Sequence, residues 1–351
     1  MKNSPKNNLS FVSIIIPCRN EEKFIGKCLD SIIAQDYPKD KLEVLIVDGM
    51  SEDKTREIIR KYIQKYSFVK ILDNPKRITP IAMNIGIKEA KGSYVLILSS
   101  HSKMGENFIQ KNVSNLQKYH VDCIGGIIMT LPASKSLLSQ SIALALSCFF
   151  GAGNAYYRTG SKKLKFVDTV PFGCYKKEVF EKIGLFDEDL LRGQDAEFNA
   201  RLKKMGGEIL LVPEIVSYYY ARDSLSKLWK MHFQYGYFKP LTAKKIGNIY
   251  TVRQLIPGIF VGSLIVSLIL SPIYNSFLWL FLFILGSYTI VNLTFSLKTS
   301  LKKGLRFFFV LPLVFATIHF SYGLGYLKGI WDFIVLKKHK KKKIEDIPLT
   351  R

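Results

Sequence analysis

Two carboxylates in this sequence stand where they could do chemistry. Asp48 directly follows the apolar run 42–47, and Asp195 follows Gly193 and Gln194 at the start of an expected helix. A carboxylate at the end of a buried strand can accept a hydrogen bond from a ligand N–H with little competition from water. A carboxylate that opens a helix keeps a fixed direction and can act as a general base. The alternatives are that Asp48 caps a turn and that Asp195 caps its helix.

Alternating strands and helices in the first hundred residues are expected to position Asp48. Apolar, β-branched runs predict buried strands at residues 12–16, 42–47, 69–72 and 94–98. Apolar residues at helical spacing predict helices at residues 22–35, 51–62 and 79–90. This alternation is typical of a parallel, doubly wound α/β sheet. Ligands bind such sheets beyond the carboxyl ends of the strands, so Pro17, Asp48 and Ser99 should converge on one crevice.

Residues 121–223 read as a mixed continuation of the same domain, which we place at residues 1–222. Strand-like segments are expected at 123–129 and 209–212, and helices at 136–149, 176–183 and 195–205. Gly184 and Gly206 follow two of these helices and are expected to end them.

The charge of the chain favours an anionic partner. Its 51 lysines and arginines against 28 aspartates and glutamates give a net charge of +23, while 48% of the residues are hydrophobic. This combination suits an anionic membrane surface better than nucleic acid, and no nucleic-acid-binding motif is present, so no nucleic acid is expected as partner. The five cysteines are scattered without a CxxC pair, so neither a disulfide framework nor a zinc site is expected.

The last third of the chain has the composition of a membrane region. Residues 223–252 predict a basic amphipathic interfacial helix and linker, with a core-facing helix as the alternative. Apolar stretches predict spans at about 255–272 and 277–297, and a third membrane segment at 307–336 whose topology stays open. Residues 337–351 form a basic tail. The N-terminus lacks an apolar signal segment, so we expect a multi-pass protein of the cell membrane with its first domain in the cytoplasm.

Taken in order, the motifs resemble family 2 inverting glycosyltransferases of the GT-A fold, closest to the membrane-anchored enzymes of the succinoglycan-biosynthesis type. The stretches that carry this resemblance are residues 17–21, 47–55, 79–80, 84–86, 150–155, 168–173, 193–201 and 319–325. The resemblance implies a GT-A doubly wound mixed sheet followed by an α-helical membrane region. It also implies transfer of a sugar from a nucleotide-diphosphate donor to a polyprenyl-linked or growing saccharide.

The resemblance assigns roles to individual residues. Asp195 takes the place of the catalytic base, which removes the proton of the acceptor hydroxyl. The donor-nucleotide residues are Pro17, Arg19, Glu21, Asp48 and Asn84. The acceptor-side candidates are Gln194, Glu197, Asn154 and Gly173. A surface position is the alternative for Asn84, and tight loop connections are the alternative for Asn154 and Gly173.

One motif departs from the family pattern. Members carry Asp-x-Asp or Asp-Ala-His after the fourth strand, to hold a divalent metal, and this chain has Ser99-Ser100-His101. Hard Mg²⁺ prefers carboxylate oxygens, so this is a poor magnesium site. Three alternatives stay open: His101 with diphosphate oxygens holds Mn²⁺, Lys103 or another cation replaces the metal, or turnover is impaired. The last alternative would make the chain a catalytically degenerate scaffold of a polysaccharide assembly complex. A transport component is a more distant alternative, because the soluble domain would stay unexplained.

The helix of the third apolar stretch contains two spaced glycines, Gly325 and Gly329. They resemble the small residues that let two helices approach closely. A phosphate-binding glycine loop needs a strand before it and a helix after it, and this segment has neither. We therefore expect a helix-packing role for both glycines.

Overall fold

The computed structural model describes residues 9–247 and 252–338. The chain divides into two compact units. The first, here called the sheet unit, comprises Met1–Ile128, Gly160–Glu188 and Phe198–Tyr219. The second, the helical unit, comprises Met129–Thr159, Asp189–Glu197 and Tyr220–Arg351. The linker residues 248–251 and most of the predicted basic tail, residues 339–351, lie outside the described residues.

The sheet unit is built on one mixed sheet with the order β3-β2-β1-β4-β8-β6-β9-β5, and β7 pairs with β9. Strands β1 to β4 are mutually parallel where they pair, whereas β8 runs antiparallel to β4 and β6. The strands are β1 (Val12–Cys18), β2 (Leu42–Asp48), β3 (Val69–Asp73), β4 (Tyr94–Ile97), β5 (Ser102–Met104), β6 (Cys123–Leu131), β7 (Lys165–Phe166), β8 (Cys174–Lys176) and β9 (Ile209–Tyr220).

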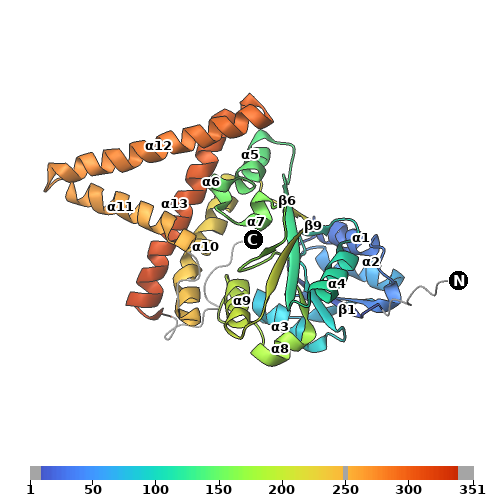
Figure 1. Cartoon of the computed structure of the whole chain (residues 1–351). Helices are drawn as coiled ribbons and strands as arrows, with labels where there is room; N and C mark the ends of the chain where they lie inside the picture. The colour runs from blue at the N-terminus through green and yellow to red at the C-terminus, as the bar shows by residue number, and fades with distance from the viewer. Residues whose placement is uncertain (1–8, 248–251, 339–351) are drawn as a thin grey trace. The chain divides into compact units, whose positions relative to one another are not determined.

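Helices pack on both faces of this sheet (Figure 1). They are α1 (Ile25–Ile33), α2 (Thr55–Lys65), α3 (Thr79–Glu89), α4 (Phe108–Tyr119) and α8 (Lys177–Ile183), with a short turn η1 (Lys39–Lys41). Because side chains alternate along a strand, Ile14 and Ile16 of β1 join the core formed with α1, α2 and α4. Ile15 faces the opposite way, against Gly86 of α3. A Cβ at Gly86 would lie 2.4 Å from the Ile15 side chain, so the close approach of α3 to β1 requires glycine.

The predicted fold class is confirmed: a mixed, doubly wound α/β sheet precedes a C-terminal helical region with one long apolar helix. Helix α2 begins at Thr55 and not at 51, because residues 48–55 form a hydrogen-bonded turn first. The sequence reasoning missed α4 and the short strands β5, β7 and β8. Gly184 and Gly206 have φ values of +80° and +81°, so both helix ends agree with the prediction.

The helical unit contains α5 (Leu137–Leu146), α6 (Phe149–Ala152), α7 (Tyr156–Thr159), α10 (Leu225–Ile246), α11 (Ile256–Leu270), α12 (Asn275–Lys303) and α13 (Leu311–Gly329). Shorter turns are η2 (Val252–Gln254), η3 (Leu305–Phe309) and the π-helical η4 (Ile330–Val335). Helix α9 (Gln194–Lys204) begins in the helical unit and ends in the sheet unit.

Helices α10 and α13 lie side by side (Figure 1) and approach closely at glycines. A Cβ at Gly325 would lie 2.1 Å from the carbonyl oxygen of Phe233, and one at Gly329 would lie 2.2 Å from that of Tyr237. Such contacts with backbone cannot be relieved by a rotamer change. The helix-packing role expected for Gly325 and Gly329 is therefore confirmed.

Helix α12 is long and apolar enough to cross a membrane, and only 11% of its most apolar window is buried. Among the described residues it is the one helix that meets both criteria, and α11 is apolar but shorter. Large apolar side chains are exposed along both helices, among them Ile259, Ile269, Trp279 and Phe283. These outward faces have the character of surfaces that meet lipid.

Candidate functional site

Two loops of the sheet unit meet beyond the carboxyl ends of β1 and β2. They are the first loop, residues 17–21, and the second loop, residues 48–55. The backbone N–H groups of Asn20 and Glu21 donate to Ser51 Oγ at 2.8 Å and Thr55 Oγ1 at 2.7 Å. In return, Asn20 Oδ1 accepts a hydrogen bond from the backbone N–H of Glu52 at 2.9 Å. The two motifs that sequence reasoning placed at one sheet edge are thus joined directly.

Asp48 lies at the base of these loops, with its side chain fully buried. It accepts hydrogen bonds from the backbone N–H of Ser51 at 3.0 Å and from Ser51 Oγ at 2.5 Å. Arg56 Nη1 donates to Asp48 Oδ2 at 2.7 Å and to Asp73 Oδ1 at 2.8 Å. The carboxylates of Asp73 and Asp48 raise the pKa of Arg56 above its usual value. Asp48 therefore organises the second loop, and any contact with a ligand must use the remaining acceptor capacity of its oxygens.

Arg19 lies across the second loop. An added Cβ at Gly49 would be 3.3 Å from Cβ and Cδ of Arg19, so glycine lets the arginine stem lie against the loop backbone. Within the described residues, Arg19 Nε is buried and has no hydrogen-bond partner. A buried donor without a partner is costly, and an anionic group of a ligand would satisfy it.

His101 connects the segment after β4 to the first loop. Its Nδ1 lies 3.2 Å from Glu21 Oε1, and its ring contacts Tyr219 at a centroid distance of 5.2 Å. Ser99 Oγ lies 3.3 Å from both ring nitrogens. Ser99, His101 and Glu21 therefore form a small polar cluster at the edge where Pro17 and Asp48 also lie.

This cluster does not fit a resident divalent metal. Glu21 is the one carboxylate in contact with His101, and the described residues contain no group of three His, Cys, Asp or Glu side chains able to hold an ion. Mg²⁺ and Mn²⁺ prefer several oxygen ligands. We therefore derive no catalytic step through a metal held by His101.

Asn84, expected on the donor side, is hydrogen-bonded to the segment 186–188. It is buried, and its Nδ2 donates to the carbonyl of Phe186 at 2.9 Å and to Glu188 Oε1 at 3.0 Å. Its Oδ1 accepts from the backbone N–H of Phe186 at 3.0 Å. Both donors of the amide are used, so Asn84 holds the 186–188 segment. Its burial excludes the surface position, and its expected contact with the donor stays a prediction.

Gly173 is explained by packing. A Cβ at this position would lie 2.8 Å from the Tyr175 ring and 3.0 Å from Cys123 Sγ. The preceding Phe172 has a φ of +48°, which marks a tight turn into β8. The structure therefore supports the alternative expected for Gly173, a tight connection.

Within the helical unit, α9 begins at Gln194 and presents Asp195 to solvent. Gly193 precedes the helix with a φ of +81°, and a Cβ there would lie 2.7 Å from Thr242 Oγ1 of α10. Asp195 is thus inside the first turn and does not serve as the cap. Gln194 Oε1 is buried and has no hydrogen-bond partner among the described residues. Glu197, expected near the mouth of the site, is 5% exposed and lies inside the unit.

The loop that carries Asn154 is fixed at both ends inside the helical unit. Arg253 Nη1 donates to Asn154 Oδ1 at 2.7 Å, and His319 Nε2 lies 2.8 Å from the carbonyl oxygen of Phe150. The Phe150 ring stacks on Phe295 at a centroid distance of 4.9 Å. Sequence reasoning singled out Asn154 and the His319 motif but missed Arg253. An arginine just before an apolar segment was the available signal.

Comparisons with known proteins define the class of this fold and then the family. Mannosyltransferase PcManGT from Pyrobaculum calidifontis, in complex with GDP-Man and Mn²⁺, matches with a TM-score of 0.60 at 17% identity, over 94% of this chain and 91% of that structure. This likeness shows the fold, that of GT-A nucleotide-sugar transferases. A family model described as glycosyl transferase family 2 matches residues 13–184.

Two relatives extend the likeness into the helical unit. A Methanococcus voltae protein, named dolichyl N-acetyl-alpha-D-glucosaminyl phosphate 3-beta-D-2,3-diacetamido-2,3-dideoxy-beta-D-glucuronosyltransferase, is 33% identical over 330 residues, 92% of this chain and 98% of the relative. Succinoglycan biosynthesis protein ExoA of Rhizobium meliloti (strain 1021) is 28% identical over 246 residues, 70% of this chain and 73% of the relative. The chain belongs to glycosyltransferase family 2. It is an enzyme, a glycosyltransferase that transfers sugars in glycan or polysaccharide synthesis.

Proposed function

We propose that this enzyme transfers a sugar, with inversion, from a nucleotide-diphosphate donor to a lipid-linked saccharide at the membrane. The observation that carries the proposal is the similarity over 92% of the chain to a transferase whose name specifies a dolichyl-linked acceptor. That similarity includes the helical unit. If the acceptor were soluble, there would be no reason for this unit to be shared. An exopolysaccharide or another cell-surface glycan is the product class that fits.

The donor side is assigned to the sheet unit. Pro17, Arg19, Glu21 and Asp48 line the nucleotide end, where two loops are joined by hydrogen bonds at one sheet edge. The unpartnered, buried Nε of Arg19 supports an anionic ligand there. His101 contributes through its contact with Glu21, which holds the first loop in place.

The acceptor side is assigned to the helical unit. Asp195 is the catalytic base: it takes the proton of the acceptor hydroxyl as that oxygen attacks the anomeric carbon opposite the leaving diphosphate. Its exposure at the first turn of α9 supports this role. The buried, unpartnered Oε1 of Gln194 supports a hydrogen bond from an acceptor hydroxyl. Asn154 contacts the acceptor from its loop.

The domain boundaries are part of the same proposal. Residues 1–222 form the catalytic domain at the cytoplasmic face, and residues 253–336 form the membrane anchor. The exposed apolar faces of α11 and α12 support more than one membrane segment. The basic residues around them favour the anionic surface at which a phosphorylated lipid acceptor resides.

The test is turnover by the purified full chain in detergent micelles. Polyprenyl-phosphate-linked N-acetylglucosamine would serve as acceptor, with a panel of UDP- and GDP-linked sugars as donors. We expect one donor to yield a product of inverted anomeric configuration, measured by NMR. Asp195→Asn should lower kcat about 10²- to 10⁴-fold with little change in KM.

Asp223→Asn is the matched control. Asp223 is an exposed carboxylate of the same unit, paired with Lys227 at 2.9 Å, and such pairs contribute little. It should leave turnover unchanged. Absence of turnover by the unmodified chain with every donor and lipid acceptor would refute the proposal.

A further inference from the structure

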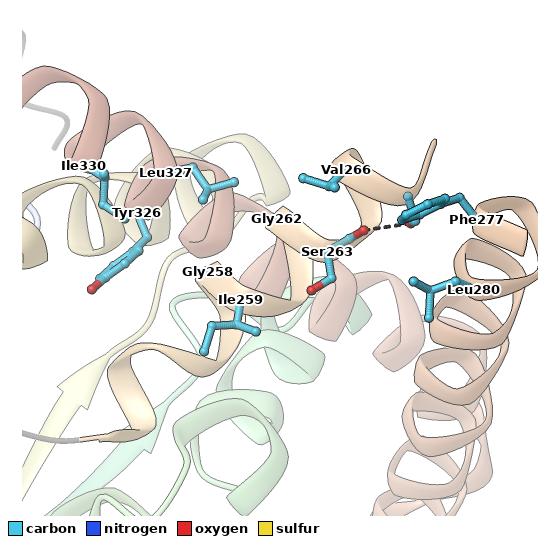
Figure 2. A pocket seen from close by; sticks show the side chains of 11 residues that line it. Gly258, Ile259, Gly262, Ser263, Val266, Phe277, Leu280, Tyr326, Leu327 and Ile330 are labelled. Atoms are coloured by element: carbon cyan, nitrogen blue, oxygen red, sulfur yellow. Dashed lines mark hydrogen bonds between the residues drawn. The ribbon is translucent and has the colours of Figure 1, made fainter. Parts of the chain in front are cut away.

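An apolar groove runs between α11, α12 and α13 within the helical unit (Figure 2). Its volume is about 430 Å³, within the range typical of small-molecule sites. Its floor consists of small residues of α11, namely Gly258, Gly262, Ser263 and Ser267. Its walls are apolar side chains of all three helices, among them Val266, Leu280 and Leu327. Of the two hydroxyls on the floor, that of Ser267 already donates to the Ser263 carbonyl at 2.7 Å.

The groove opens because α11 and α13 diverge. At Gly323 an added Cβ would lie 2.4 Å from the carbonyl of Pro257, so the two helices touch there. At Gly262 an added Cβ meets nothing closer than Leu327 Cδ2 at 3.5 Å, which is an ordinary contact. The space beyond Gly262 is therefore left open by the backbone, and a larger side chain at that position would fill it without displacing a helix.

One end of the groove leads to polar groups. Tyr326 closes the end opposite Phe277 and Leu280 (Figure 2). Arg253 lies in η2, which contacts α11 and precedes Gly258 at this end of the groove by five residues. Arg253 in turn donates to Asn154 Oδ1 at 2.7 Å. An apolar channel thus ends beside a guanidinium that is joined to the loop assigned to the acceptor.

We propose that this groove holds the first isoprene units of the polyprenyl acceptor, with the acceptor phosphate at Arg253. The inference rests on the proposed function, because it names the subsite for the same acceptor. The occupant must combine an apolar chain with an anionic head, since the apolar walls and the cation lie at successive points of one path. From Gly258 to Ser267 the floor is about 14 Å long at 1.5 Å per residue, a length that suits a linear chain.

The experiment is a substitution that fills the groove. Gly262→Phe places a ring over the floor, and Gly286→Phe is the matched control. Gly286 lies on α12, where an added Cβ meets nothing within 4 Å, and it does not line the groove. Both variants add the same apolar side chain to an apolar helix, so they share any general effect on membrane insertion.

Kinetics are measured with a long polyprenyl-phosphate-linked acceptor and with a short, soluble citronellyl-phosphate-linked one. We expect Gly262→Phe to raise KM for the long acceptor about tenfold while KM for the donor and for the short acceptor stays unchanged. Gly286→Phe should change none of them. Equal KM values for the long acceptor in both variants would overturn the assignment of the isoprenoid chain to this groove.

Photolabelling separates the acceptor from bulk lipid. A polyprenyl phosphate with a diazirine near its phosphate end should label α11 or α13 next to Gly262, and Gly262→Phe should abolish that labelling. Equal labelling of the same residues by a diazirine-bearing phosphatidylcholine would overturn the proposal in favour of a lipid-exposed surface. If the unmodified chain transfers no sugar yet is labelled next to Gly262 only by the polyprenyl probe, the proposed function fails and the groove assignment stands.

Discussion

His319 Nε2 lies 2.8 Å from the carbonyl oxygen of Phe150, although 169 residues separate them. A carbonyl can only accept, so Nε2 carries the proton, and Nδ1 then accepts from the Tyr288 hydroxyl at 3.0 Å. One neutral imidazole thereby ties α12 and α13 to the loop that bears Asn154. Because we propose that this loop contacts the acceptor, we expect His319 to be a positioning residue.

Removal of this bond should affect the acceptor more than the donor. His319→Ala leaves the Phe150 carbonyl without its buried partner, a loss of about 1–3 kcal/mol. We expect KM for the lipid acceptor to rise roughly tenfold while KM for the donor stays constant. Tyr288→Phe, which removes only the second hydrogen bond, should cause a smaller rise. Parallel changes in both KM values would point to general unfolding and contradict the positioning role.

Arg56 should stabilise the second loop through Asp48. In Arg56→Gln the buried Asp48 carboxylate loses its cationic partner, and because Arg56 is partly exposed we expect a discounted loss of about 2 kcal/mol in the free energy of unfolding. Denaturant unfolding of the full chain in detergent measures this quantity. Arg60→Gln, on the exposed face of the same helix, is the control. If both variants unfold at the same denaturant concentration, the Asp48–Arg56 pair has no stabilising role.

His232 should make the stability of the helical unit fall in acid. Burial, together with the charge of Arg158, lowers the pKa of His232 to about 4, whereas its usual value is 6.5. The unfolded chain therefore binds the proton first as the pH falls. Above pH 6.5, the neutral, buried His232 contributes about 3 kcal/mol to the free energy of unfolding. This contribution is lost as the pH falls from 6.5 to about 4.

The measurement compares melting temperatures between pH 7.5 and 4.5 for the native chain and His232→Gln. Between these two pH values, the melting temperature of the native chain should fall further than that of the variant. Since other acidic groups titrate equally in both proteins, the difference between the two curves isolates His232. Identical slopes would contradict the prediction.

Restoring a carboxylate after β4 should restore strong metal dependence. Ser99→Asp adds a hard oxygen ligand next to the His101–Glu21 pair, so added Mn²⁺ should increase the turnover of the variant more than that of the native chain. Chelation with EDTA should then lower the turnover of the variant more than that of the native chain. Ser93→Asp, an exposed position before the other end of β4, is the control. An equal effect of Mn²⁺ on the variant and on the native chain would contradict this prediction.

The predictable part of the fold is the part with local, periodic patterns. Buried parallel strands are continuous apolar runs, so β1 and β2 stand out, and their ends place Pro17 and Asp48 at one edge. Strand β8 has only three residues and takes its place between β4 and β6 through antiparallel pairing with segments about 50 to 80 residues away. No local pattern encodes such a pairing.

The amino-acid sequence by itself determined the order of motifs, the identity of the carboxylates and the apolar character of the last third. Tertiary structure alone decided how the polar side chains are used. Asn84 and Gly173 resemble ligand-binding residues in sequence, yet one holds the 186–188 segment and the other fits against Tyr175. Hydrogen bonds and close packing join residues that are distant in the chain, so the partners of Asp48, His101 and His319 become known only when the chain is folded.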